Sequence, residues 1–183
     1  MMYRSGTHLV FAIAGLLVLC TSAIASEFVA DVTMAFGGKS NGGKVYIKGA
    51  MFRMDRFAAN GDLLFTVGKD GSRTLRYIKP RTKEFWDETA RPIDDVVSDK
   101  LLVRVAEKKV IGRETLHGYV CRKVLYTYHQ KTMGAETRWY AEKLGAPIRL
   151  EWKGLTINYS NITQQRVRSS VFATPRGFKH RPS

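Results

Sequence analysis

Apolar and polar residues alternate regularly near the beginning of this chain. Between Phe28 and Phe36 every second residue is apolar, and polar side chains such as Asp31 and Thr33 stand between them. A period of two is typical of a β-strand that buries one face. This segment is the clearest strand that the sequence predicts.

Turn residues divide the first half of the chain into six segments of this kind. A glycine-rich run at residues 37–43 marks the first turn, and Asn60-Gly61-Asp62 and Asp70-Gly71 mark later ones. Short strands joined by such turns indicate an antiparallel meander. We expect its strands at Phe28–Phe36, Lys44–Lys48, Met51–Phe57, Leu63–Val67, Arg73–Ile78 and Lys83–Asp87.

One segment between the strands has a helical rhythm. Pro92 stands where a first-turn proline is tolerated, and Asp94 and Asp95 would lie near the positive end of a helix dipole. Apolar residues then recur at helical spacing from Ile93 to Val103. The sequence therefore predicts one amphipathic helix here, able to pack as a lid over the meander.

Strand patterns resume after this segment and complete the predicted fold. They favour a mainly β fold with minor α, in which an antiparallel curved sheet, or half-barrel, is covered on its concave side by one or more helices. Such a sheet either fills its hollow with side chains or keeps it for an apolar guest, and the sequence leaves both open. The later strands are expected at Val110–Glu114, Tyr119–Tyr128, Glu136–Ala141, Ile148–Trp152 and Leu155–Ile162.

Strand parity selects the residues that would line a hollow, because alternate side chains share one face. Any one of the aromatic residues is explained more simply as core, since aromatic side chains are favoured in strands anyway, and a subset that lines an apolar cleft is the alternative. The candidate ligand-binding residues are Phe28, Val32, Met34, Phe36, Val45, Ile47, Phe52, Met54, Trp139, Leu150 and Trp152.

The first 25 residues have the features of an export signal. Arg4 precedes an apolar run from Leu9 to Cys20, and Ala23 and Ala25 are small residues of the kind a signal peptidase reads. The run is shorter than the ~20 residues that span a bilayer. We expect a periplasmic protein with a signal peptide at 1–25, one half-barrel domain at 26–178 and a disordered basic tail at 179–183.

Composition narrows the range of partners. The chain has 30 basic and 16 acidic residues, a formal net charge of +14, and the basic residues are dispersed along it. Nucleic acid is not expected as a partner of an exported protein. Two interpretations remain: a solvated, repulsive surface, or a surface attracted to anionic lipid head groups and polymers of the envelope.

Motifs for chemistry are missing from the sequence after residue 25. His117, His129 and His180 are isolated, and no H-x-x-x-H, C-x-x-C or G-x-S-x-G occurs. We therefore expect no catalysis, no metal and no cofactor. If Cys20 is removed with the signal, Cys121 is a lone thiol, either a small buried strand residue or a site of mixed disulfide formation.

Several stretches of the sequence resemble a known family in their order. Gly43–Gly49 with Phe52–Asp55, Ile111–Lys123, Asn158–Ile162 and Phe172–Phe178 are similar to exported bacterial proteins of the periplasmic lipoprotein-carrier superfamily. The greatest similarity is to a sister outer-membrane lipoprotein-sorting-like domain of unknown function. The resemblance implies a many-stranded half-barrel with helix cover, whose relatives carry lipoprotein acyl chains between membranes or sense envelope stress.

Two hypotheses about function follow. The first is a periplasmic, non-catalytic binding or carrier protein that holds a lipid or lipoprotein acyl chain in the hollow of the half-barrel. The alternative is a cell-envelope scaffold or signalling module with a packed core, whose basic face binds a protein partner or an anionic polymer. The sequence leaves the oligomeric state open.

Overall fold

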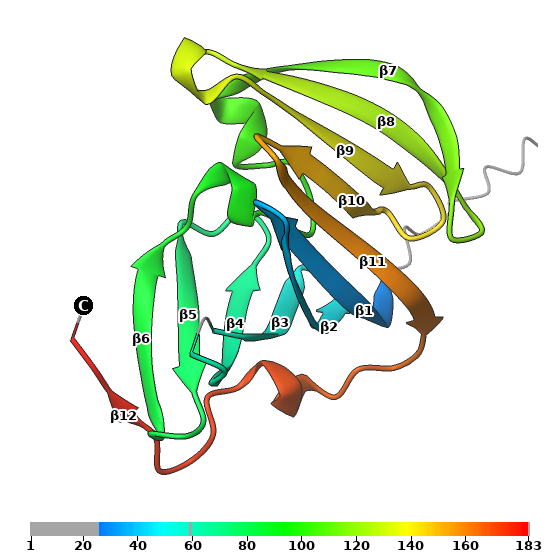
Figure 1. Cartoon of the computed structure of the whole chain (residues 1–183). Coiled ribbons are helices and arrows are strands. Elements are labelled where there is room, and N and C mark those ends of the chain that lie inside the picture. The colour runs from blue at the N-terminus through cyan, green and yellow to red at the C-terminus, as the bar shows by residue number, and fades with distance from the viewer. Residues whose placement is uncertain (1–25, 59, 183) are drawn as a thin grey trace, which may run out of the picture.

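The computed structural model describes residues 26–58 and 60–182, which form a single curved sheet (Figure 1). The expected signal peptide lies outside the described residues. The sheet has twelve strands in the order β12-β6-β5-β4-β3-β2-β1-β11-β10-β9-β8-β7, and neighbours are antiparallel except for the parallel pair of β12 and β6. The mainly β, curved antiparallel fold expected from the sequence is confirmed.

The elements have the following bounds. The strands are β1 (Glu27–Phe36), β2 (Lys39–Lys48), β3 (Met51–Phe57), β4 (Leu63–Lys69), β5 (Thr74–Lys79), β6 (Glu84–Thr89), β7 (Ala106–Leu116), β8 (Tyr119–Tyr128), β9 (Ala135–Ala141), β10 (Ala146–Trp152), β11 (Leu155–Gln164) and β12 (Lys179–His180). Four short 3-10 helices accompany them: η1 (Pro92–Asp94), η2 (Leu102–Arg104), η3 (Lys131–Met133) and η4 (Ser169–Phe172).

The first and eleventh strands join the two blocks of the meander. Val32 of β1 lies opposite Tyr159 of β11, and Met34 lies opposite Ile157. The register shifts near the start of β1, and Asn161 of β11 has a positive φ of 49° close to that point. An irregularity of this kind bends a strand and adds twist, which favours the curvature seen in Figure 1.

The turn formed by the glycine-rich run is shorter than the sequence predicted. Only Gly37 and Gly38 have the positive φ of the turn, and β2 already begins at Lys39. Gly43 lies within β2 where a Cβ atom would come within 1.9 Å of the carbonyl oxygen of Asp55. Glycine is therefore needed at position 43 for the close approach of β2 and β3, and not for a loop.

The predicted helix over Ile93–Val103 is wrong. Residues 90–105, which we call the strap, contain only the single turns η1 and η2, and the described residues include no α-helix. The carbonyl oxygens of Pro92, Asp95 and Ser98, which an α-helix would bond internally, accept hydrogen bonds from Arg138 of β9. The apolar spacing nevertheless marks buried residues, because Ile93 and neighbouring strap residues pack into the core.

The predicted disordered tail is also partly wrong. Lys179 and His180 form β12, which lies against β6 at the edge of the sheet (Figure 1). The Lys179 amide donates to the carbonyl oxygen of Lys83 at 2.8 Å. The His180 ring lies 5.0 Å from the ring of Phe85, centroid to centroid. These contacts order the tail because its backbone groups pair with the backbone groups at the open edge of β6.

Two hydrophobic clusters stabilise the sheet. The larger contains Phe28, Val45 and Ile47, which are fully buried, together with the strap residues Ile93 and Val96. The smaller joins residues of β8 and β9 to the other end of the strap and includes Leu102, Val124, Tyr126, Tyr128 and Tyr140. The strap is therefore held against the sheet at both of its ends.

Candidate ligand-binding site

A pocket of about 140 Å³ lies between the sheet and the first part of the strap. Cross-strand pairs connect Met54 with Thr66 and Thr66 with Tyr77, so these side chains share one face of the sheet. Most of the lining is apolar. The lining residues are Met34, Phe52, Met54, Arg56, Thr66, Leu75, Tyr77, Arg91, Ile93, Asp94, Val96, Trp152, Leu155 and Ile157.

The charged residues of the pocket come from two elements. Arg56 is near the end of β3, and Arg91 and Asp94 belong to the strap. Arg91 donates to the Asp94 carboxylate through Nε at 3.0 Å and through a terminal nitrogen at 2.9 Å. Burial is the main cause that raises the pKa of the Tyr77 phenol, so this hydroxyl stays protonated at neutral pH.

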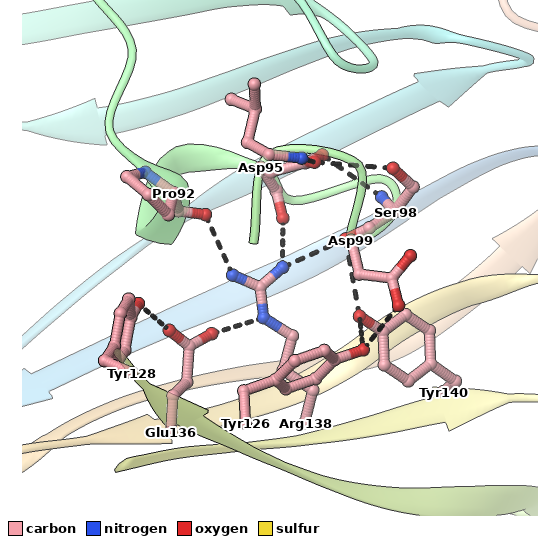
Figure 2. A network of polar contacts seen from close by, with 10 residues as sticks. Pro92, Asp95, Ser98, Asp99, Tyr126, Tyr128, Glu136, Arg138 and Tyr140 are labelled. Atoms are coloured by element: carbon pink, nitrogen blue, oxygen red, sulfur yellow. Dashed lines mark hydrogen bonds and ion pairs between the residues drawn. The ribbon is translucent and has the colours of Figure 1, made fainter. Parts of the chain in front are cut away.

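Arg138 holds in place the strap residues that form one wall of the pocket. Its side chain is fully buried and its Nε donates to Glu136, two residues away on the same strand. Figure 2 shows the guanidinium pointing from β9 to the strap, where it donates to the carbonyl oxygens of Pro92 at 3.1 Å, Ser98 at 3.0 Å and Asp95. A buried cation with its donors satisfied in this way orders a segment that has no regular structure.

Aspartates of the strap accept hydrogen bonds both from the strap itself and from the sheet. The Asp95 carboxylate accepts from the backbone amides of Ser98 at 3.3 Å and Leu101 at 3.1 Å. Asp99 accepts from the hydroxyl of Tyr126 at 2.7 Å and from Lys108 (Figure 2 shows the tyrosine). Burial raises the pKa of the Asp99 carboxyl, but these hydrogen bonds outweigh it and lower the pKa overall.

Four of the sequence-predicted residues lie together in the pocket: Met34, Phe52, Met54 and Trp152. Five others are buried core residues away from its lining, namely Phe28, Val32, Val45, Ile47 and Leu150. Strand parity therefore selects residues that line the pocket together with residues of the packed core, and it does not separate the two groups.

The two remaining predicted residues, Phe36 and Trp139, do not line the pocket. Phe36 is 64% exposed at the end of β1, where the sheet has no layer to cover it. Trp139 follows Arg138 on β9 and so projects from the opposite face of that strand. Its indole N–H donates to Glu114 at 2.7 Å, and the charged groups of Lys123 and Arg149 lie near its ring.

The sequence missed most of the polar lining of the pocket. Arg56 continues the parity of Phe52 and Met54, so the period of two could have identified it. Arg91 and Asp94 could not be found in this way, because the strap was expected to be helical. Among residues 26–58 and 60–182, no cluster of three or more side chains suits a metal ion. No helix there is long and apolar enough to cross a membrane.

Comparisons with known proteins find solved structures of similar fold. No protein family and no curated protein matches the sequence. An uncharacterised conserved protein from Thermus thermophilus matches 87% of this chain over 92% of its own, with a TM-score of 0.61 and 11% identity. PNGF-II matches 87% of this chain with a TM-score of 0.58 and 10% identity, and this chain spans only 32% of it.

A LolA superfamily protein from Nitrosomonas europaea is also similar in structure. The match covers 81% of this chain and 90% of that protein's chain, with a TM-score of 0.44 and 11% identity. At these identities the similarity establishes the fold alone, and the chemistry has to be argued from the pocket.

Proposed function

We propose that this protein is a periplasmic, non-catalytic binding or carrier protein that holds the apolar part of a ligand, such as the end of a lipid acyl chain, in the pocket beneath the strap. The observation that supports this most directly is the open pocket of about 140 Å³ with mainly apolar walls. Much of the rest of the concave face is filled by buried core side chains.

The size of the pocket sets the size of the guest. An apolar cavity of about 150 Å³ in another protein binds benzene, so this pocket takes roughly six carbon atoms. A guest of that size buries ~150 Å², like one aromatic side chain, which contributes about 4 kcal/mol. Because association itself costs free energy, this burial alone supports binding no tighter than about 1 mM. Tighter binding therefore requires polar contacts or a longer chain that continues outside the pocket.

Filling the pocket tests this function. Met34 lines the pocket, whereas Phe36, two residues further along β1, is exposed outside it. We expect Met34→Trp to weaken binding of an apolar fluorescent probe by roughly tenfold or more, because the indole occupies the space of the guest. Phe36→Trp is the matched control and should bind the probe as the wild type does. Equal probe binding by both variants would refute the pocket as the binding site.

A second function has one observation in its favour. The pocket is smaller than the roughly 300–1,000 Å³ of typical small-molecule sites, and much of the concave face is packed, as an envelope scaffold or signalling module would require. In that case the basic surface binds a protein partner or anionic polymer. Binding to anionic liposomes that falls as salt rises, without retained lipid or probe binding, would favour this alternative.

A further inference from the structure

Two side chains of the pocket carry polar atoms that nothing in the described structure satisfies. Thr66 of β4 is 8% exposed, and its hydroxyl oxygen has no hydrogen-bond partner. Arg56 of β3 is half-buried, and its Nε is buried without a partner. Buried polar atoms are nearly always hydrogen-bonded in folded proteins, so two orphans in one pocket call for a ligand or water that completes them.

The two groups are arranged to act on one ligand. Thr66 lies opposite Met54 in the register of β3 and β4, and Arg56 is two residues beyond Met54 on the same face. They are therefore diagonal neighbours across the strand pair, at a spacing of about 7–8 Å between Cα atoms. A single small polar group placed in the pocket lies within reach of both.

The charge of the pocket favours an anion. Arg91 is neutralised by Asp94, with which it forms two hydrogen bonds. Arg56 forms no ion pair with any carboxylate of residues 26–58 and 60–182, and its guanidinium lies 5.9 Å from the centre of the Tyr77 ring. The lining thus carries one positive charge that no carboxylate compensates, beside the buried hydroxyl of Thr66, and most of the other lining residues are apolar.

We propose that this pocket binds the carboxylate of a short- or medium-chain fatty acid, with Arg56 and Thr66 as its hydrogen-bond donors and Met34, Met54 and Ile157 against its hydrocarbon. The inference rests on the proposed function and specifies its ligand. A guanidinium matches a planar carboxylate, and a hydrogen bond to a charged group is stronger than one between neutral groups. A single arginine and a single hydroxyl are suited to a monoanion with two oxygens.

The experiment compares octanoate with 1-octanol by calorimetry on the wild-type protein and three variants. We expect octanoate to bind roughly tenfold or more tightly than 1-octanol. Arg56→Met, which keeps the apolar stem, should abolish this preference, and Thr66→Val should reduce it about two- to fivefold. Arg122→Met, at an exposed position of β8, is the control and should keep the full preference.

The possible results distinguish this inference from the proposed function on which it rests. Equal binding of octanoate and 1-octanol, or a preference that survives Arg56→Met, overturns the inference and leaves the apolar binding function standing. Binding of neither ligand, together with no binding of an apolar probe, overturns both. Tighter binding of octyl phosphate than of octanoate overturns the assignment to a carboxylate. If Arg56→Met does not fold, Thr66→Val and the two wild-type affinities decide.

Discussion

Arg138 donates a hydrogen bond to the carbonyl oxygen of Pro92, 46 residues earlier in the chain, at 3.1 Å. This contact joins the middle of β9 to the start of the strap. Because the strap residues Ile93 and Val96 form part of the pocket wall, Arg138 determines where that wall stands without lining the pocket itself. One wall of the pocket is therefore held in place by a buried cation that lies far from it in the sequence.

Replacing this cation should destabilise the whole domain. Arg138→Met leaves the fully buried Glu136 carboxylate without its ion pair and removes the hydrogen bonds from Arg138 to three strap carbonyl groups. Removal of one partner from a buried pair costs about 3–5 kcal/mol. We expect a loss of this size in the free energy of unfolding, measured by urea denaturation, and increased hydrogen exchange in the strap.

The chain offers a matched control for this prediction. Arg149 and Glu151 form the same kind of pair, two residues apart on β10, but their side chains are 34% and 42% exposed. Arg149→Met should cost at most about 1 kcal/mol. The double variant Arg138→Met with Glu136→Leu should recover part of the loss, because it removes the stranded charge. If both single variants cost the same, the buried network does not carry the stability assigned to it.

The strands could be predicted from the sequence because their pattern is local. The expected Phe28–Phe36 and Tyr119–Tyr128 segments match β1 and β8 to within one residue, and Met34 and Met54, chosen by parity, both line the pocket. A period of two follows from the backbone geometry of a single strand, so it needs no knowledge of the partner strand.

The strap and the polar lining could not be predicted because they depend on distant partners. Residues 93–103 have apolar spacing that suits a helix, and only the hydrogen bonds from Arg138 show why another conformation is stable. Phe36 continues the alternation of β1 but extends past the layer that would bury it. Burial at a strand end is decided by what lies opposite, which the alternation does not encode.

The orphan hydroxyl of Thr66 predicts a substitution that stabilises the empty protein. Thr66→Val keeps the shape of the side chain and removes a buried polar atom without a partner. We expect the free energy of unfolding to rise by about 1 kcal/mol in the absence of ligand. Thr127→Val, at an exposed position of β8, should change it by no more than about 0.5 kcal/mol. A loss of stability in Thr66→Val would mean that its hydroxyl is satisfied in the native protein.

The thiol of Cys121 should be unreactive in the folded protein. It is fully buried, and burial is the main cause that raises its pKa. Because the thiolate is the reactive form, we expect modification by a thiol reagent at pH 8 to be at least about 100-fold slower than in unfolded protein. The measurement compares the chain from residue 26 onward in buffer and in urea. Rapid modification of the native protein would instead support the redox alternative.

The buried tyrosines around the strap predict a loss of stability in alkaline solution. Burial raises the pKa of Tyr140 to about 12, and it also raises the pKa values of Tyr126 and Tyr128. A phenol in an unfolded chain has a pKa of about 10. Since the folded state holds these protons more tightly, their stabilising effect is complete below pH 10 and is lost as pH rises from 10 toward 12. We expect the urea midpoint to fall across this range, and the absorbance of phenolate at these residues to appear together with unfolding. Ionisation of all tyrosines near pH 10 with the fold intact would contradict the buried network.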